Sequence, residues 1–181
     1  MNTDDLLVEA FDRVRGGVHR VVDGMTPDQL AFCPVDGTNS IAWLVWHLTR
    51  IQDDHIADAV GTEQVWTTHG WVERFDFPFD PADTGYGHEV DEVEAVRVRS
   101  GDMLTGYHDA VHEQTVHYVR NLAEGDLGRI VDESWDPPVT LGVRLISVIS
   151  DDLQHAGQAA YIRGIGERDS FERRFPSAPP S

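Results

Sequence analysis

Four long segments with helical periodicity constrain the fold of this chain more than any other feature. Apolar residues recur every three or four positions over residues 3–23, 41–60, 90–122 and 141–163. This spacing is typical of an α-helix that buries one face. Four amphipathic helices in 181 residues, with one long connection between the second and third, predict an all-α four-helix bundle.

The ends of these segments carry residues that start and stop helices. Residues able to cap a helix N-terminus precede or open three segments: Asn2 or Thr3, Ser40 and Thr140. Glycines follow three segments: Gly24, Gly61 and Gly164. We therefore expect the first helix to end near Asp23, the second near Val60 and the last near Arg163. Residues 1–165 are predicted to form one domain and residues 166–181 a C-terminal tail.

The sequence between the second and third helices has a different character. Residues 61–88 place aromatic side chains among Gly, Pro and Asp with no persistent period. A connection of this length in a small domain is usually functional or a crossover, and its aromatic content predicts a packed lid. We expect a kink at Ser100–Gly101 in the third helix and a short extended excursion over residues 125–138.

Composition excludes several classes of function. The chain has 14 basic and 32 acidic residues, a formal net charge of −18, and every basic residue is an arginine. Nucleic-acid binding needs a basic stripe, which this charge pattern lacks. Without lysine there is neither a Schiff-base lysine nor a Walker-type phosphate loop.

The N-terminal sequence and the single cysteine bear on the compartment. Acids at Asp4 and Asp5 stand where a secretory signal needs basic and then apolar residues. The lone Cys33 has no partner for an internal disulfide, and no apolar stretch is long enough to cross a membrane. We expect a cytoplasmic protein with no membrane partner.

Three side chains form a candidate metal site. Asp151 and His155 are four residues apart, so a helix projects both from one face. His47 interrupts the most apolar stretch of the chain, residues 41–48, where an unpaired imidazole would cost free energy. The pattern leaves two structural alternatives open: a surface pair at 151 and 155, and a core histidine bonded to a backbone carbonyl.

The segments Trp43–Leu48, Asp151–Gln158 and Tyr161–Gly164 resemble the DinB superfamily. The resemblance extends in order and spacing from the first helix to Gly164. It is closest to the branch of mycothiol-dependent enzymes that includes maleylpyruvate isomerase. The resemblance implies a four-helix bundle that binds one divalent metal, often zinc or nickel.

The resemblance also implies which residues are the metal ligands. They are His47 from the second helix and Asp151 and His155 from the fourth. Many members have His at the position of Asp151 and the isomerase branch has Glu, so the shorter carboxylate is a departure that affects metal affinity and identity. Asp152 is the alternative ligand if the register differs by one residue.

The chemistry implied is activation of a small thiol. A bound metal lowers the pKa of a thiol and holds the thiolate, which attacks an electrophile or isomerises a double bond. The resemblance therefore implies a mycothiol-dependent S-transferase or isomerase acting on a small electrophile, as a possible homodimer. The alternatives are a non-catalytic metal-binding, stress-associated protein, a metal-dependent hydrolase and a bundle without metal. Because Cys33 precedes a proline with no nearby histidine, we expect the reactive thiol to come from a cosubstrate.

Several other residues receive structural interpretations. His108 and His112 are expected on a solvated face, and His55 on a polar surface. Gly157 is expected to permit close helix packing and Gln158 to support a ligand. Arginines that could anchor an acidic substrate are expected in salt bridges instead: Arg50, Arg144 and Arg163. Tryptophans at 43, 46, 66 and 71 are expected in the core, with a pocket wall as the alternative.

Overall fold

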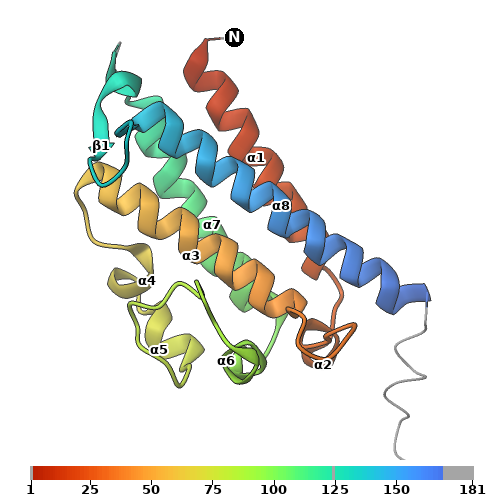
Figure 1. Ribbon diagram of the computed structural model, residues 1–181. Helices are drawn as coiled ribbons and strands as arrows, with labels where there is room; N and C mark the ends of the chain where they lie inside the picture. The colour runs from red at the N-terminus through yellow and green to blue at the C-terminus, as the bar shows by residue number, and fades with distance from the viewer. Residues whose placement is uncertain (1, 124, 169–181) are drawn as a thin grey trace, which may run out of the picture.

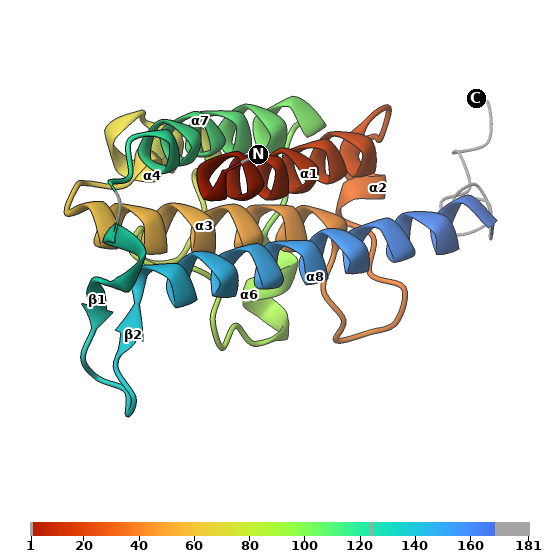
Figure 2. The same ribbon diagram turned by 90° about the horizontal axis from the view of Figure 1, so that it is seen from above.

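The computed structural model describes residues 2–123 and 125–168, and its four long helices form a bundle (Figure 1). They are listed here with their bounds: α1 (Thr3–Val22), α3 (Ile41–Val60), α7 (Gly101–Arg120) and α8 (Leu141–Arg168). α3 packs along α8 and α1 along α7, and Figure 2 shows these pairs as two layers. The predicted all-α bundle is confirmed.

The predicted helix starts are also confirmed. The Asn2 side chain accepts a hydrogen bond from the Asp5 amide, and the Ser40 side chain accepts one from the Trp43 amide. Thr140 Oγ1 accepts from the Val143 amide at 3.4 Å. Gly61 ends α3 in the left-handed region, with a φ of 77°, a conformation that favours glycine.

Contacts between helices establish their directions. α1 runs antiparallel to α7, since Asp12 contacts His112 while Val22 contacts Gly101. α3 runs parallel to α7: Thr49 contacts His108, and Gln52 contacts Thr115 further along. A chain that leaves α3 must therefore return to the other end of the bundle before α7 begins, which explains the long crossover over residues 61–100.

The crossover and the last connection contain short elements. The crossover holds α4 (Val65–Thr68), α5 (Trp71–Phe75) and α6 (Val90–Ala95), and α2 (Pro27–Leu30) lies between α1 and α3. The expected extended excursion is a two-stranded antiparallel sheet after the turn η1 (Asp126–Gly128), made of β1 (Ile130–Asp132) and β2 (Val139–Thr140).

The prediction of one helix over residues 90–122 is wrong. α6 ends at Ala95 and α7 begins at Gly101, so the chain is broken at this point and not merely kinked. Val96 and Val98 are buried while Arg97 and Arg99 are exposed. Such alternation has a period of two, so an extended segment buries both valines where a helix would expose one of them.

The last helix is longer than predicted. α8 continues through Gly164 to Arg168 instead of ending at Arg163. Arg163 explains the continuation, because its Nε donates to Glu167 at 2.8 Å and its Nη1 donates to the carbonyls of Arg20 and Asp23 at the end of α1. Of the predicted tail, residues 169–181 lie outside the described residues.

A buried polar network anchors the crossover to the bundle. The Arg50 and Asp53 side chains are buried and lie 3.7 Å apart. Asp53 accepts hydrogen bonds from the Val65 and Trp66 amides at the start of α4, and from the Tyr107 hydroxyl of α7. Both charged groups therefore have partners, as burial requires, although Arg50 Nη2 makes no hydrogen bond to the described residues.

His108 and His112 were predicted on a solvated face, and this prediction is wrong. Both are buried where α7 faces α1 and α3. His112 Nε2 lies 2.9 Å from Asp12 Oδ1, and His108 Nδ1 lies 3.1 Å from Thr49 Oγ1. Burial lowers the pKa of His108 from 6.5 to about 3, so its imidazole is neutral in the folded protein.

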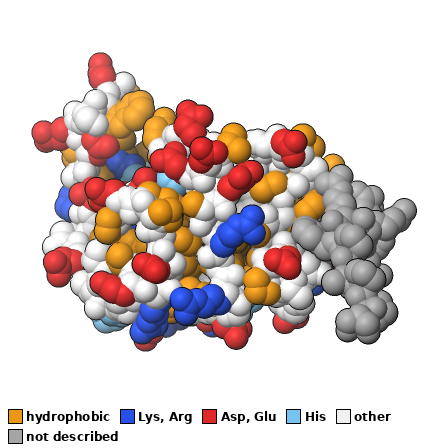
Figure 3. Space-filling model, turned by 90° about the horizontal axis from the view of Figure 1, so that it is seen from below, with side chains coloured by type: hydrophobic (Ala, Val, Ile, Leu, Met, Phe, Trp, Pro, Cys, Tyr) orange, Lys and Arg blue, Asp and Glu red, His pale blue; other side chains and the backbone are white. Residues whose placement is uncertain are grey.

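The outer surface carries the negative charge of the chain. Asp and Glu side chains are spread over the face drawn in Figure 3, between apolar side chains and arginines. Within residues 2–123 and 125–168, no helix is both long and apolar enough to cross a membrane.

The neutral His108 predicts a pH dependence of stability. Below pH 6.5 the unfolded chain binds a proton at this residue, and the folded chain does not until about pH 3. The free energy of unfolding should therefore fall as the pH falls, with His108 contributing roughly 2 kcal/mol of loss between pH 7 and pH 5. In urea denaturation at the two pH values, His108→Gln should reduce the loss by this amount. The exposed His117→Gln should leave it unchanged, and equal losses in both variants would contradict the prediction.

Candidate metal centre

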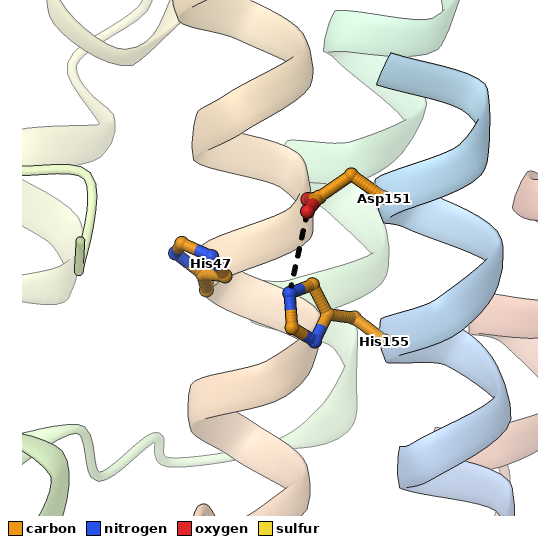
Figure 4. A group of neighbouring side chains, drawn as sticks. All are labelled: His47, Asp151 and His155. Carbon is orange, nitrogen blue, oxygen red and sulfur yellow. Dashed lines mark ion pairs between the residues drawn. The ribbon is translucent and has the colours of Figure 1, made fainter. Parts of the chain in front are cut away.

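The structure brings together the three side chains singled out in the sequence. His47 lies on α3, Asp151 and His155 lie on α8, and the three point toward one another (Figure 4). Their potential ligand atoms all lie within 4.8 Å of one another. His155 Nε2 is 3.6 Å from Asp151 Oδ1.

Helix geometry distinguishes Asp151 from its neighbour. Residues 151 and 155 share one face of α8, whereas residue 152 is rotated by about 100° toward the bundle interior. The Asp152 side chain is fully buried, and its carboxylate oxygens have no hydrogen-bond partner among the described residues. Burial raises the pKa of Asp152 well above its usual range. Asp151, and not Asp152, faces the two histidines.

Both imidazole rings are oriented by oxygen acceptors. His47 Nδ1 lies 2.5 Å from the Thr84 carbonyl oxygen, and His155 Nδ1 lies 2.7 Å from Gln158 Oε1. Because each partner accepts a hydrogen bond, we assign the proton of each neutral ring to Nδ1. The lone pair of each ring is then on Nε2. The predicted supporting role of Gln158 agrees with this geometry.

The surroundings keep His47 neutral and partly shield the centre. His47 is 6% exposed, and burial is the main cause that lowers its pKa. The Trp43 ring stacks on the His47 ring with centroids 4.5 Å apart. Asp151 Oδ2 is buried without a hydrogen-bond partner in the described part of the chain. Two imidazole lone pairs and an unsatisfied carboxylate oxygen are a donor set that suits a divalent metal.

A loop of the crossover that was not singled out in the sequence positions His47. Thr84 supplies the carbonyl that orients the ring, and Arg50 Nε donates to the neighbouring Asp83 carbonyl at 3.1 Å. Gly85 has a φ of 90°, and a Cβ there would lie 2.9 Å from His47 Nδ1. The two glycines at 85 and 87 were the available signal, since paired glycines within an aromatic segment mark a turn or a close approach.

A second group of potential ligands lies in the same loop. Potential ligand atoms of Asp83, His88 and Glu92 are also within 4.8 Å of one another. However, Trp43 Nε1 donates to His88 Nδ1 at 3.1 Å, which places the proton of neutral His88 on Nε2. That nitrogen faces Asp83 Oδ2 at 3.2 Å. The 3.2 Å approach is an ion-pair distance, since His88 Nε2 makes no hydrogen bond to the described residues. With its proton on Nε2, His88 has no free lone pair for a metal.

The structure also places four other residues that were interpreted from the sequence: Arg144, His55, Cys33 and Gly157. Arg144 pairs with Asp132 at 2.7 Å, in agreement with the expected salt bridge. His55 lines a depression of about 190 Å³ beside the centre, together with His47, Tyr86 and Asp151. Burial raises the pKa of the Cys33 thiol, which disfavours a nucleophilic role. The prediction for Gly157 is wrong, because a Cβ there would meet nothing within 4 Å.

The tryptophans divide between the centre and the core. Trp66 and Trp71 pack with Tyr107 in the aromatic core, at centroid distances of 5.1 and 5.7 Å. Trp43 covers the candidate centre, as described above. Trp46 stacks on His88 with centroids 5.8 Å apart. All four tryptophans are buried, as expected for the core, and Trp43 also packs against the candidate centre.

The fold and these three side chains define a class of protein: a helical bundle with a candidate metal centre between two antiparallel helices. Comparison with known families shows to which family within this class the chain belongs. A family model described as mycothiol S-transferase matches residues 6–167. The chain therefore belongs to this DinB-like family.

A solved structure agrees with this assignment. Three chains of known structure match, among them one described as a conserved protein of locus from Enterococcus faecalis. It is 30% identical to this chain, has a TM-score of 0.84, and the match covers 90% of this chain and 96% of that one. A search of curated proteins gave no match.

Close packing at Gly85 predicts a localised sensitivity to substitution. Gly85→Ala places a Cβ within 3.2 Å of atoms in His47, Trp46 and Trp43, whereas Gly87→Ala meets nothing within 4 Å. Both glycines have positive φ, so backbone strain is common to both variants. Gly85→Ala should lower the free energy of unfolding by about 1–3 kcal/mol more than Gly87→Ala in urea denaturation. Equal effects would show that the loop is not packed tightly against His47.

Proposed function

We propose that this protein is a metal-dependent mycothiol S-transferase whose His47, Asp151 and His155 bind one divalent metal ion. The observation that carries the proposal is the convergence of one potential ligand atom each from His47, Asp151 and His155, all within 4.8 Å of one another. Membership of the mycothiol S-transferase family supports the thiol. Zinc and nickel are the metals proposed, since both accept imidazole and carboxylate ligands.

Three protein ligands suit a catalytic site because they leave positions for other groups. When bound, the metal supplies a positive charge that lowers the pKa of a thiol and favours its thiolate. In S transfer the thiol loses its proton, its sulfur forms a bond to an electrophilic carbon, and the leaving group departs with its electron pair. Addition and elimination at a double bond would instead give isomerisation.

The residues of the chain have separate roles in this proposal. Thr84 and Gln158 orient the two rings through their Nδ1 atoms and leave each Nε2 lone pair for the metal, which reduces the reorganisation needed for binding. Asp151 contributes the negative charge that partly offsets the charge of the cation. Trp43 covers the His47 ring and excludes water from that side.

Metal content tests the ligand assignment. Purified protein should contain close to one divalent ion per chain, measured by elemental analysis after dialysis. His47→Ala and His155→Ala should each weaken binding strongly, since two remaining ligands bind poorly. The exposed His117→Ala is the matched control and should retain the metal. Wild-type protein with a stoichiometry near zero after incubation with zinc or nickel would contradict the proposed site.

Thiol dependence tests the reaction class. Metal-loaded protein incubated with a small electrophile should form a thioether only when mycothiol is present, with the product followed by mass spectrometry. His155→Ala should lose this activity, and His117→Ala should retain it. Turnover that does not depend on the thiol would favour a hydrolase, and no turnover of a panel of electrophiles would favour a non-catalytic metal-binding protein.

A further inference from the structure

A groove beside the candidate metal centre is lined by uncharged residues, although the chain is rich in charge. It has a volume of about 380 Å³ and lies between the loop before α3 and the C-terminal half of α8. Its lining residues are Pro34, Gly37, Thr38, Asn39, Leu44, Gln158, Tyr161 and Ile162. This volume is within the range of small-molecule pockets, roughly 300–1,000 Å³.

The groove adjoins the candidate centre through residues one helical turn from two of its side chains. Leu44 lies one helical turn before His47, and Gln158 lies one turn after His155. Gln158 belongs to both places, because its Oε1 accepts from His155 Nδ1 while the residue lines the groove. A molecule in this groove can therefore extend a reactive group toward the centre.

The lining is uncharged in a chain that is 25% charged. None of the eight lining residues is acidic or basic. The nearby Arg163 is occupied, since its Nη1 donates to the Arg20 and Asp23 carbonyls. An anionic ligand would find no arginine to pair with its carboxylates in this groove, whereas a neutral ligand would bury no opposing charge.

Several polar groups of the lining are available to a ligand. Within the described residues, no hydrogen bond to protein involves the Asn39 side chain, the Tyr161 hydroxyl or Gln158 Nε2. Tyr161 is 73% exposed and presents its ring beside the apolar floor of Leu44 and Ile162. An aromatic ring with flanking amides offers both an apolar face and hydrogen bonds, which suits a sugar-like polyol.

We propose that this groove binds the glucosaminyl-inositol part of mycothiol and directs its cysteinyl thiol toward His155. This inference rests on the proposed function. The chemistry matches, because mycothiol is a neutral thiol whose cysteine is joined through an amide to a pseudodisaccharide rich in hydroxyl groups. Asn39 and Gln158 bond to hydroxyls, and Tyr161 contacts an apolar face of a ring.

The same lining discriminates among thiols. Glutathione carries two carboxylates, for which the groove has no cationic partner. The groove therefore favours mycothiol over glutathione through the cost of burying unpaired anions. Asn39, Gln158 and Tyr161 are specificity-determining residues in this assignment, and none of them needs to contact the reacting sulfur.

The test measures binding without the reaction. The probe is an analogue of mycothiol in which alanine replaces cysteine, titrated into the full-length protein and followed by saturation-transfer NMR and calorimetry. Asn39→Ala and Tyr161→Ala should each weaken binding by roughly three- to tenfold. Tyr161→Phe should retain most of the ring contribution. Tyr86→Ala is the matched control: it removes another exposed tyrosine, on the depression at the other side of the centre, and should leave binding unchanged.

The outcomes separate this inference from the proposed function. The probe should still bind to His47→Ala protein, so loss of the metal does not remove the evidence for the groove. If Tyr86→Ala weakens probe binding and Tyr161→Ala does not, the polyol lies on the other side and the inference is overturned. Activity with mycothiol that is unchanged in KM for Asn39→Ala and Tyr161→Ala would also overturn it, while leaving the S-transferase proposal intact. A circular dichroism spectrum like that of wild type establishes that each variant is folded.

Discussion

The buried pair of Arg50 and Asp53 is the interaction on which the candidate centre depends. Both side chains are on α3, yet their partners lie in the crossover and on α7. Arg50 holds the carbonyl of Asp83, and the next residue, Thr84, orients His47. Removal of either charge would leave the other buried without its partner, which is strongly unfavourable. The network that fixes the crossover therefore also fixes the first of the proposed ligands.

The sequence predicted the four helices because their signals are local. Period, caps and glycines act within a few residues, as the Ser40 cap and Gly61 show. The segment after Ala95 was mispredicted since the valines at 96 and 98 could be read as part of a longer helical pattern. These two valines are buried, and the arginines beside them are exposed, because of the direction in which the crossover approaches the bundle. That direction depends on contacts distant in sequence, which periodicity does not report.

In the candidate centre, too, some features could be predicted from local sequence and others depend on contacts distant in sequence. The spacing of Asp151 and His155 is a local property of one helix, so the sequence was sufficient to propose the pair. His47 stood out because it is polar within an apolar segment. Thr84 and Gly85 gave no comparable signal, since a backbone carbonyl can belong to any residue, and the need for glycine arises only when His47 and Trp46 pack against it. His108 was misplaced for a similar reason: its burial depends on the packing of α7 against α3, where its Nδ1 meets Thr49.

The net charge of −18 also has a different meaning beside the proposed site. An acidic surface repels anionic thiols and electrophiles in general, and this repulsion is weak at physiological ionic strength beyond about 8 Å. Selection among thiols must therefore occur at short range. At the centre, Asp152 is buried with a raised pKa and adds little negative charge beside Asp151. In the proposed site, one carboxylate and two imidazoles that bind through their lone pairs would leave a divalent cation with a residual positive charge. That charge would favour a thiolate, and the uncharged groove beside the centre would add no competing charge.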